Sequence, residues 1–327
     1  MKGEIKIVDF KQDLKKTSTA FLDYYGVKYK KKDTLQTLLI KLYTFFEKYV
    51  VPQKRHVCYS QELICKKQTL PKEVQQALFK MEKWIEDGVD INCFQGRGLY
   101  GTGSRDYQNS LYRIVHLHLS ASEQDRFPVT KGRFAKPGKY LLFVLFKNEI
   151  AFFLDVIPHP QPLNKDAPPA TEWTSSNWIK IMENNWPKLL EKAKVPIDFL
   201  CDGSGNKIEL NDRDIAELTS NHINTIVSGN QGNYLLGLGV SGSGDSIYAV
   251  MSAHKSVNYA TQCELLYKKK KEEIHAALRN ILLDAGHAVP KEFDIHFDFV
   301  PDFGTSVVLD RISGAGIDFG TKQLFIV

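Results

Sequence analysis

The chain has 327 residues, with a hydrophobic content of 43%, a charged content of 25% and a formal net charge of +5. This length fits two domains, or one domain with an added lobe, and a core of that size needs no disulfide or metal to be stable. The composition is that of an ordinary soluble globular protein, and the small positive charge permits an anionic partner without requiring one.

The cysteines and the apolar segments bear on the cellular compartment. The cysteines are odd in number, lie far apart and form no CxxC pair; they are Cys58, Cys65, Cys93, Cys201 and Cys263. This pattern disfavours a zinc ribbon or a disulfide framework and favours a reducing compartment. No apolar run has the length of a membrane span, and residues 1–6 lack the apolar stretch of a signal peptide. We therefore expect a cytoplasmic protein with no membrane partner.

Residues 1–90 are predicted to be mainly helical. Asp33 is a suitable N-cap for a helix whose leucine and aromatic residues recur at helical spacing as far as Pro52. A second helix is expected to begin near Pro71 and to stop at Gly88. Residues 56–60, between the two helices, are expected to form a short strand or a loop.

Residues 91–200 are predicted to form a central antiparallel sheet with one helix. A glycine-rich loop leads into a strand from Tyr112 to Ser120, which a basic loop follows. Two apolar strands, Tyr140–Phe146 and Glu149–Ile157, then form a hairpin whose two-residue turn is Lys147–Asn148.

The rest of the chain completes a predicted α+β fold. A helix is expected at about Ser175–Ala193, with either a kink or a new turn at Pro187. The glycine-rich stretch Cys201–Asn206 is the best domain boundary, and residues 201–327 are expected to form a C-terminal α/β or α+β lobe. Its expected elements are a short helix from Asp212, a long helix at 261–285, and strands at 233–240, 246–253, 293–300, 305–309 and 323–327.

Two histidines on the first strand of the central sheet give the most informative pattern. Side chains alternate along a strand, so His116 and His118 share one face and the apolar residues between them share the other. On the second hairpin strand, alternation separates Asp155 from the apolar face formed by Ile150, Phe152, Leu154 and Val156. His159 lies on the same face as Asp155 if the backbone remains extended beyond Ile157. The two polar faces coincide in one of two registers, which a single sequence does not specify.

A cluster of these four side chains would suit phosphodiester cleavage. His116 and His118 would act as acid and base, His159 as a second proton-transfer group, and Asp155 as the residue that orients an imidazole. Positive side chains of the basic loop would bind the phosphate backbone; they are Lys131, Arg133, Lys136 and Lys139.

Two other interpretations use the same residues. His116, His118 and His159 have the ligand types of a divalent zinc or non-haem iron site. Alternatively, the histidines are polar residues on the outer face of a sheet, paired with water or with neighbours.

The central segment resembles the RelE/YoeB-like ribonuclease toxins, whose twisted antiparallel sheet carries similar strand motifs. The likeness lies in Tyr112-Arg113-Ile114, in Tyr140-Leu141-Leu142-Phe143-Val144, and in Phe152-Phe153-Leu154-Asp155-Val156 with His159 after it. The paired histidines and the insertion at 121–138 depart from those toxins. The remainder of the chain resembles a bacterial or mobile-element protein.

These observations predict a nucleic-acid hydrolase, specifically a ribonuclease of toxin or phage-defence type that needs no cofactor. RNA is the expected substrate, and an antitoxin or another protein is an expected partner. The alternatives are a binding module for nucleic acid or protein without catalysis, and a metalloenzyme at the histidine pair.

Overall fold

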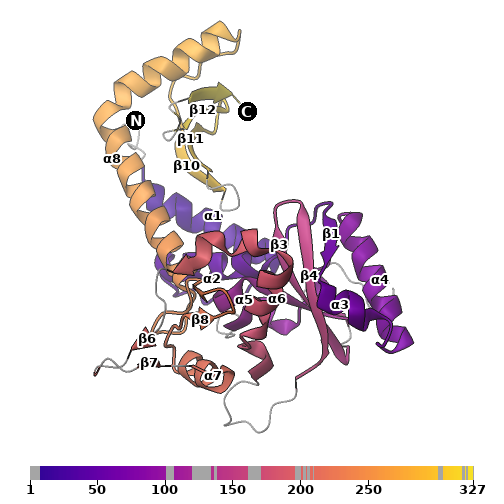
Figure 1. Cartoon of the computed structure of the whole chain (residues 1–327). Helices are drawn as coiled ribbons and strands as arrows, with labels where there is room; N and C mark the ends of the chain where they lie inside the picture. Colours follow the sequence, from indigo (N-terminus) through magenta and orange to yellow (C-terminus); the bar gives the residue numbers. More distant parts are fainter. Residues whose placement is uncertain are drawn as a thin grey trace. The chain divides into compact units, whose positions relative to one another are not determined.

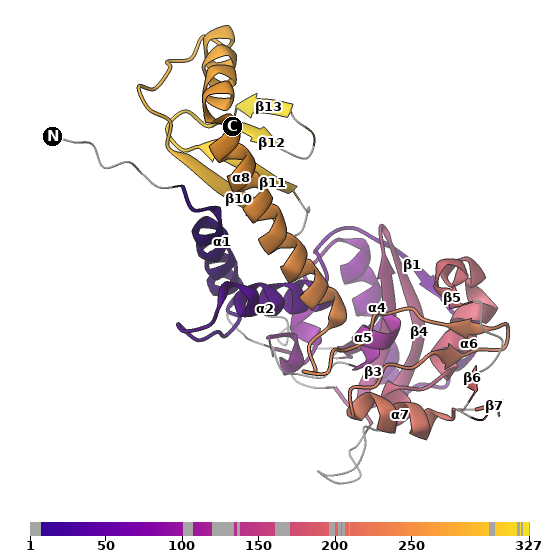
Figure 2. The same ribbon diagram turned by 90° about the vertical axis from the view of Figure 1, so that its left-hand side faces the viewer.

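The computed structural model describes residues 8–100, 107–119, 134–135, 138–160, 171–195, 200–201, 204, 207–208, 210–300, 305–318, 321 and 323–326. The described residues combine helices with several β-sheets whose strands pair mainly antiparallel, so the fold belongs to the predicted α+β class (Figures 1 and 2).

The α-helices are α1 (Phe10–Tyr25), α2 (Leu35–Lys48), α3 (Gln61–Lys67), α4 (Lys72–Glu86), α5 (Tyr107–Tyr112), α6 (Asn177–Asn185), α7 (Asp212–Ser220) and α8 (Ile247–Asp284). The longer strands are β1 (His56–Tyr59), β2 (Ile114–His118), β3 (Tyr140–Lys147), β4 (Ile150–Pro158), β10 (Ile295–Val300), β11 (Thr305–Asp310), β12 (Ala315–Asp318) and β13 (Gln323–Ile326). Five two-residue strands lie between α6 and α8: β5 (Lys194–Val195), β6 (Leu200–Cys201), β7 (Lys207–Ile208), β8 (Val227–Ser228) and β9 (Asn233–Tyr234).

The chain forms two compact units, Met1–Tyr43 with Ala249–Val327, and Thr44–Tyr248. These units differ from the three consecutive regions expected from the sequence, because both ends of the chain contribute to one core. Phe10 and Leu39 belong to the same buried cluster as Leu278 and Phe297. The sequence of an amphipathic helix shows which of its residues form the apolar face. It does not show which distant segment of the chain covers that face.

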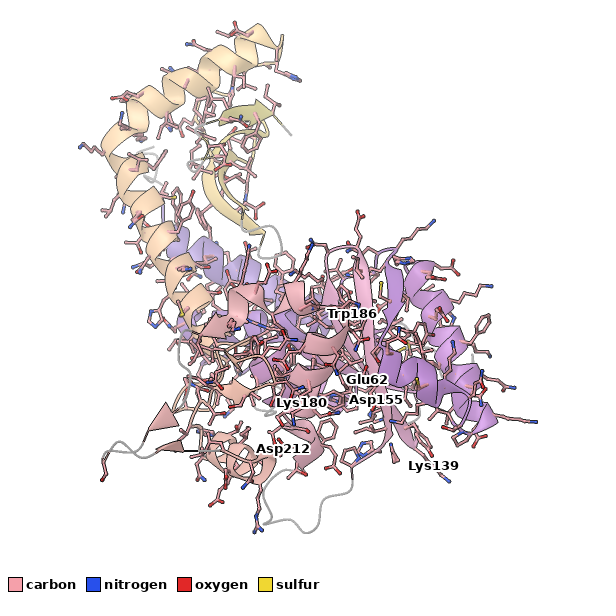
Figure 3. All side chains as sticks on the ribbon, in the orientation of Figure 1. Glu62, Lys139, Asp155, Lys180, Trp186 and Asp212 are labelled. Carbon is pink, nitrogen blue, oxygen red and sulfur yellow. The ribbon has the colours of Figure 1, made fainter. Side chains whose placement is uncertain are left out.

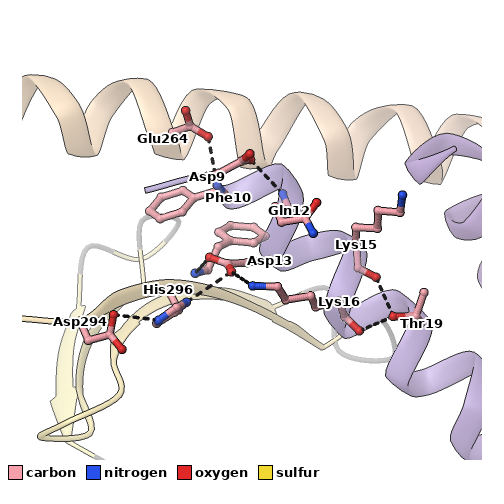
Figure 4. A network of polar contacts seen from close by, with 11 residues as sticks. Asp9, Phe10, Gln12, Asp13, Lys15, Lys16, Thr19, Glu264, Asp294 and His296 are labelled. Atoms are coloured by element: carbon pink, nitrogen blue, oxygen red, sulfur yellow. Dashed lines mark hydrogen bonds and ion pairs between the residues drawn. The ribbon is translucent and has the colours of Figure 1, made fainter. Parts of the chain in front are cut away.

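Polar contacts join α1 to α8 and to the last sheet, all within the unit formed by Met1–Tyr43 and Ala249–Val327 (Figure 4). The backbone N–H of Phe10 donates to Glu264 Oε2 at 3.0 Å. The Asp13 carboxylate lies 3.3 Å from His296 Nδ1, and Asp294 lies 3.1 Å from the other ring nitrogen of His296. The sheet itself is antiparallel, in the order β10-β11-β12-β13. Residues more than 250 positions apart in the chain therefore form one structural unit.

Several local predictions are confirmed, and others need correction. The helix expected near Pro71 is α4. The helix expected after Asp33 is α2, but the side chain of Thr34 accepts the hydrogen bond from Thr37 N, while Asp33 binds Lys41. The chain begins a new 3₁₀ turn at Pro187, since α6 ends at Asn185.

The strand predicted at 246–253 is wrong, because α8 begins at Ile247. Ala249, Ala253 and Ala260 are all buried on one face of this helix, so the short apolar run is the first part of a helical stripe. The turn of the central hairpin also shifts by one residue, to Asn148–Glu149, with Asn148 at a φ of 52°.

The central sheet of the second unit has the order β1-β4-β3-β2. Strands β2, β3 and β4 form an antiparallel meander, and β1 pairs with β4 in parallel. Helix α6 packs on one face, where the Trp178 ring stacks on Phe143 with 4.4 Å between centroids. No helix within the described part of the chain is both long and apolar enough to cross a membrane.

Candidate active site

The strand register places the predicted site residues on one face of the central sheet. His116 lies opposite Phe143 on β3, and Phe143 lies opposite Asp155 on β4. Two residues further along β2, His118 lies opposite Leu141. Directly opposed residues of antiparallel strands point to the same side. The predicted coincidence of the histidine face with the Asp155 face is therefore confirmed.

A β-bulge corrects the predicted alternation along β4. Val144 pairs with Phe153 and Phe143 pairs with Asp155, so Leu154 is an extra residue without a partner on β3. The bulge shifts the side-chain pattern by one position, and Phe152 therefore shares a face with Asp155 instead of opposing it. One face thus carries an apolar end and a polar end. Figure 3 shows the two ends, with Trp186 toward one and Lys139 toward the other.

His159 extends the site beyond the end of β4. Its backbone N–H donates to the carbonyl of Lys139 at 2.8 Å, which continues the pairing of β3 with β4. Its ring Nδ1 lies 2.8 Å from the carbonyl oxygen of Pro160. A carbonyl only accepts hydrogen bonds, so Nδ1 carries the proton and Nε2 of the neutral ring holds the lone pair.

The three histidines form a contiguous cluster. The rings of His118 and His159 are nearly parallel, with 5.4 Å between their centroids and 23° between their planes. The rings of His116 and His118 are 6.1 Å apart and close to perpendicular. The cluster lies at the polar end of the sheet, and each ring lies within about one ring's width of the next.

Trp173 is a member of the site that the sequence did not predict. Its ring lies 5.0 Å from the ring of His116 and 6.1 Å from that of His159, and it is half-buried. Trp173 ends the short 3₁₀ helix η5 (Thr171–Trp173), which precedes α6. A tryptophan outside any regular apolar pattern carries no local signal of this position, so only the tertiary structure identifies it.

His118 is the most buried histidine of the cluster, with 8% of its surface exposed. Burial, together with the nearby His116 and His159 rings, lowers the pKa of His118 from 6.5 to about 4, and the Gly138 backbone acts in the opposite direction. Gly96, from the predicted glycine-rich loop, lies beside this ring, and a Cβ there would be in ordinary van der Waals contact with His118 Nε2, at 3.5 Å. His118 is therefore neutral at pH 7.

Asp155 pairs with a lysine and not with an imidazole, which corrects the orienting role predicted for it. Lys66 Nζ, from α3, donates to both carboxylate oxygens of Asp155 at 2.8 and 2.9 Å. The backbone N–H of Val156 donates to the same carboxylate. This ion pair joins α3 to β4 and neutralises a charge that would otherwise be buried alone.

Three of the four predicted phosphate-binding residues, Lys131, Arg133 and Lys136, lie outside the described residues. Lys139 is described and exposed. It lies directly before β3 and opposite His159, and Figure 3 labels it at the polar end of the sheet. The position of Lys139 therefore agrees with a contact to an anionic group that reaches the cluster.

The metal-site interpretation receives no further support from side-chain positions. Among the residues that the structure describes, no group of three or more His, Cys, Asp or Glu side chains is arranged to hold a metal ion. No family model, curated protein or solved structure matches this chain. The residues of the site and their geometry are therefore the basis for a functional assignment.

The lowered pKa of His118 predicts a specific dependence of stability on pH. Between pH 6.5 and about 4 the unfolded chain protonates His118 and the folded chain does not, so acidification favours unfolding. We expect the stability of wild type relative to His118→Asn to fall by about 1–3 kcal/mol from pH 7 to pH 4.5.

Urea unfolding followed by tryptophan emission measures this difference. All four tryptophans (Trp84, Trp173, Trp178 and Trp186) belong to the unit Thr44–Tyr248, so the emission reports on the unit that contains His118. An unchanged difference between the two proteins across this pH range would contradict the prediction.

Proposed function

We propose that the chain is a ribonuclease whose clustered histidines transfer the protons of phosphodiester cleavage. The observation that carries this proposal is the convergence of three histidine rings at one end of the sheet: the ring centroid of His118 lies 6.1 Å from that of His116 and 5.4 Å from that of His159. Imidazoles are the side chains best suited to move protons near neutral pH. Their grouping on one face supports a chemical role over that of separate surface residues.

The surroundings of the rings suggest a division of roles. His118 is buried and neutral, so it suits the general base that deprotonates the attacking hydroxyl. His159 is half-exposed, and its Nδ1–H is held by the Pro160 carbonyl. When protonated, it presents Nε2–H to the leaving oxygen as a general acid. Because neighbouring positive charges repel, a proton on His159 favours the neutral form of His118, and the pair holds one acid and one base.

RNA is the substrate that fits this chemistry. Acid–base catalysis by histidines suits a phosphodiester that carries its own nucleophile, and the 2′-hydroxyl of RNA lies next to the scissile phosphate. The half-buried Trp173 beside two of the histidines suits stacking with an unpaired base. The resemblance of β2, β3 and β4 to RelE/YoeB-like toxins supports the same substrate, and a toxin role with an antitoxin partner forms part of the proposal.

The proposal predicts cleavage of single-stranded RNA and not of DNA of the same sequence. The expected products end in 2′,3′-cyclic phosphate, because the 2′-hydroxyl attacks the adjacent phosphorus. A single 2′-deoxy substitution at the cleaved nucleotide should prevent cleavage there. Gel electrophoresis and mass spectrometry of the fragments measure both results.

Two outcomes would count against this mechanism. Equal cleavage of RNA and DNA would exclude the 2′-hydroxyl as nucleophile, and the absence of RNA cleavage would refute the ribonuclease function. A parallel reaction with a chelator separates the alternatives: unchanged cleavage supports proton transfer by histidines, whereas loss of cleavage that zinc or iron restores supports the metalloenzyme.

A further inference from the structure

A pocket of about 170 Å³ lies beside the histidine cluster. Its walls include Asp155, which shares the cross-strand row of His116 and Phe143. They also include Glu172, whose neighbour Trp173 contacts two of the histidines. The lining residues are Asp155, Ile157, Thr171, Glu172, Ser175, Asn177 and Trp178.

The lining suits a flat aromatic ring with a polar edge. Ile157 supplies apolar surface together with the small part of Trp178 that is exposed (3%), while Thr171, Ser175 and Asn177 supply neutral polar groups. Among the described residues, two carboxylates and no positive side chain line the pocket, which disfavours a phosphate there. A nucleobase combines a planar apolar face with hydrogen-bonding groups on its edge, and such bases bind between aromatic or apolar side chains.

Only one of the two carboxylates is suited to accept hydrogen bonds from a nucleobase. Both oxygens of Asp155 accept hydrogen bonds from Lys66, and one also accepts from Val156 N–H. Glu172 is exposed, and its backbone carbonyl accepts a hydrogen bond from Trp178 Nε1 at 3.0 Å. This bond fixes the Glu172 backbone against the aromatic wall of the pocket.

On the basis of the proposed ribonuclease function, we propose that this pocket is a guanine subsite in which the Glu172 carboxylate accepts hydrogen bonds from guanine N1–H and N2–H. An ionised carboxylate accepts two parallel hydrogen bonds and donates none. Guanine has two adjacent donors on its Watson–Crick edge. Adenine and cytosine place an acceptor next to their amino group, and uracil flanks its single N–H with carbonyls.

Binding of guanosine, inosine and adenosine 3′-monophosphates to the full-length protein tests the subsite by calorimetry. Inosine differs from guanosine only by the missing amino group. We expect guanosine 3′-monophosphate to bind about tenfold or more tightly than the inosine compound, because a hydrogen bond to a charged acceptor is lost. Equal affinities, or no binding of any of the three, would overturn the subsite.

The variant Glu172→Gln provides a second test of the subsite. A glutamine amide offers one acceptor and one donor, which matches the edge of adenine. The variant should lose the preference for guanosine over inosine and bind the adenosine compound more tightly than wild type does. Glu191→Gln, at an exposed position in the 3₁₀ turn Glu191–Ala193, is the matched control and should keep the guanosine preference. A preference that persists in Glu172→Gln would refute the role of Glu172.

The two proposals fail in different ways. Guanosine preference in a protein that cleaves no RNA would retain the subsite and refute the ribonuclease. Cleavage of RNA after every base with equal rate, together with equal nucleotide affinities, would retain the ribonuclease and refute the subsite.

Discussion

His118→Ala is expected to lower the rate of RNA cleavage by about 10²–10⁴-fold, the usual contribution of a general base. The variant removes the imidazole of His118, whose pKa is lowered to about 4. It leaves β2 in place, since the backbone pairing of this strand with β3 does not depend on the side chain. Initial rates on a fluorescent RNA oligonucleotide, with wild type and variant at equal concentration, measure the effect.

His56→Ala is the matched control for this experiment. His56 lies on β1 of the same sheet, but its side chain is exposed and it belongs to no part of the cluster. We expect this control to retain the wild-type rate. A folded His118→Ala protein, shown by unchanged circular dichroism, that cleaves at the wild-type rate would refute the proposed base.

Phe143→Ala is expected to lower the free energy of unfolding of the unit Thr44–Tyr248 by about 3–5 kcal/mol. Phe143 is fully buried. Its ring stacks on Trp178 at 4.4 Å and lies 6.1 Å from Trp173 and 6.5 Å from His116. Truncation therefore leaves a cavity between the core and the site. Urea unfolding followed by tryptophan emission measures the loss.

A second phenylalanine of the same strand controls for the loss of an aromatic ring. Phe146 is half-buried, and the Arg55 guanidinium lies 5.3 Å from the centre of its ring. Phe146→Ala should cost about 1 kcal/mol, because less apolar surface is removed from a packed environment. Equal losses in the two variants would show that Phe143 has no special place in the core.

The apolar patterns of the sequence predicted the central elements well. Alternating and continuous apolar runs identified β3 and β4, and helical spacing identified α2 and α4, since these periods follow from local backbone geometry. The same reasoning failed at the start of α8. There a run of eight residues was too short to distinguish a strand from the first turns of a helix.

The candidate site was predictable in part. Strand alternation alone placed His116 and His118 together, and extension of β4 added His159. The position of Asp155 on the same face was expected, but its partner was not. Lys66 comes from a helix that precedes β4 by more than eighty residues, and no local pattern relates the two.

The sequence by itself determined the class of the fold, the two hairpin strands and the pairing of His116 with His118 on one face, because these depend on interactions between near neighbours. Only the tertiary structure decided the register that brings His159 next to them, the bulge at Leu154, and the position of Trp173 beside the histidines. It also decided that both chain ends share one core. Each of these depends on packing between distant segments, where many arrangements satisfy the same local pattern and the best burial of apolar surface selects one.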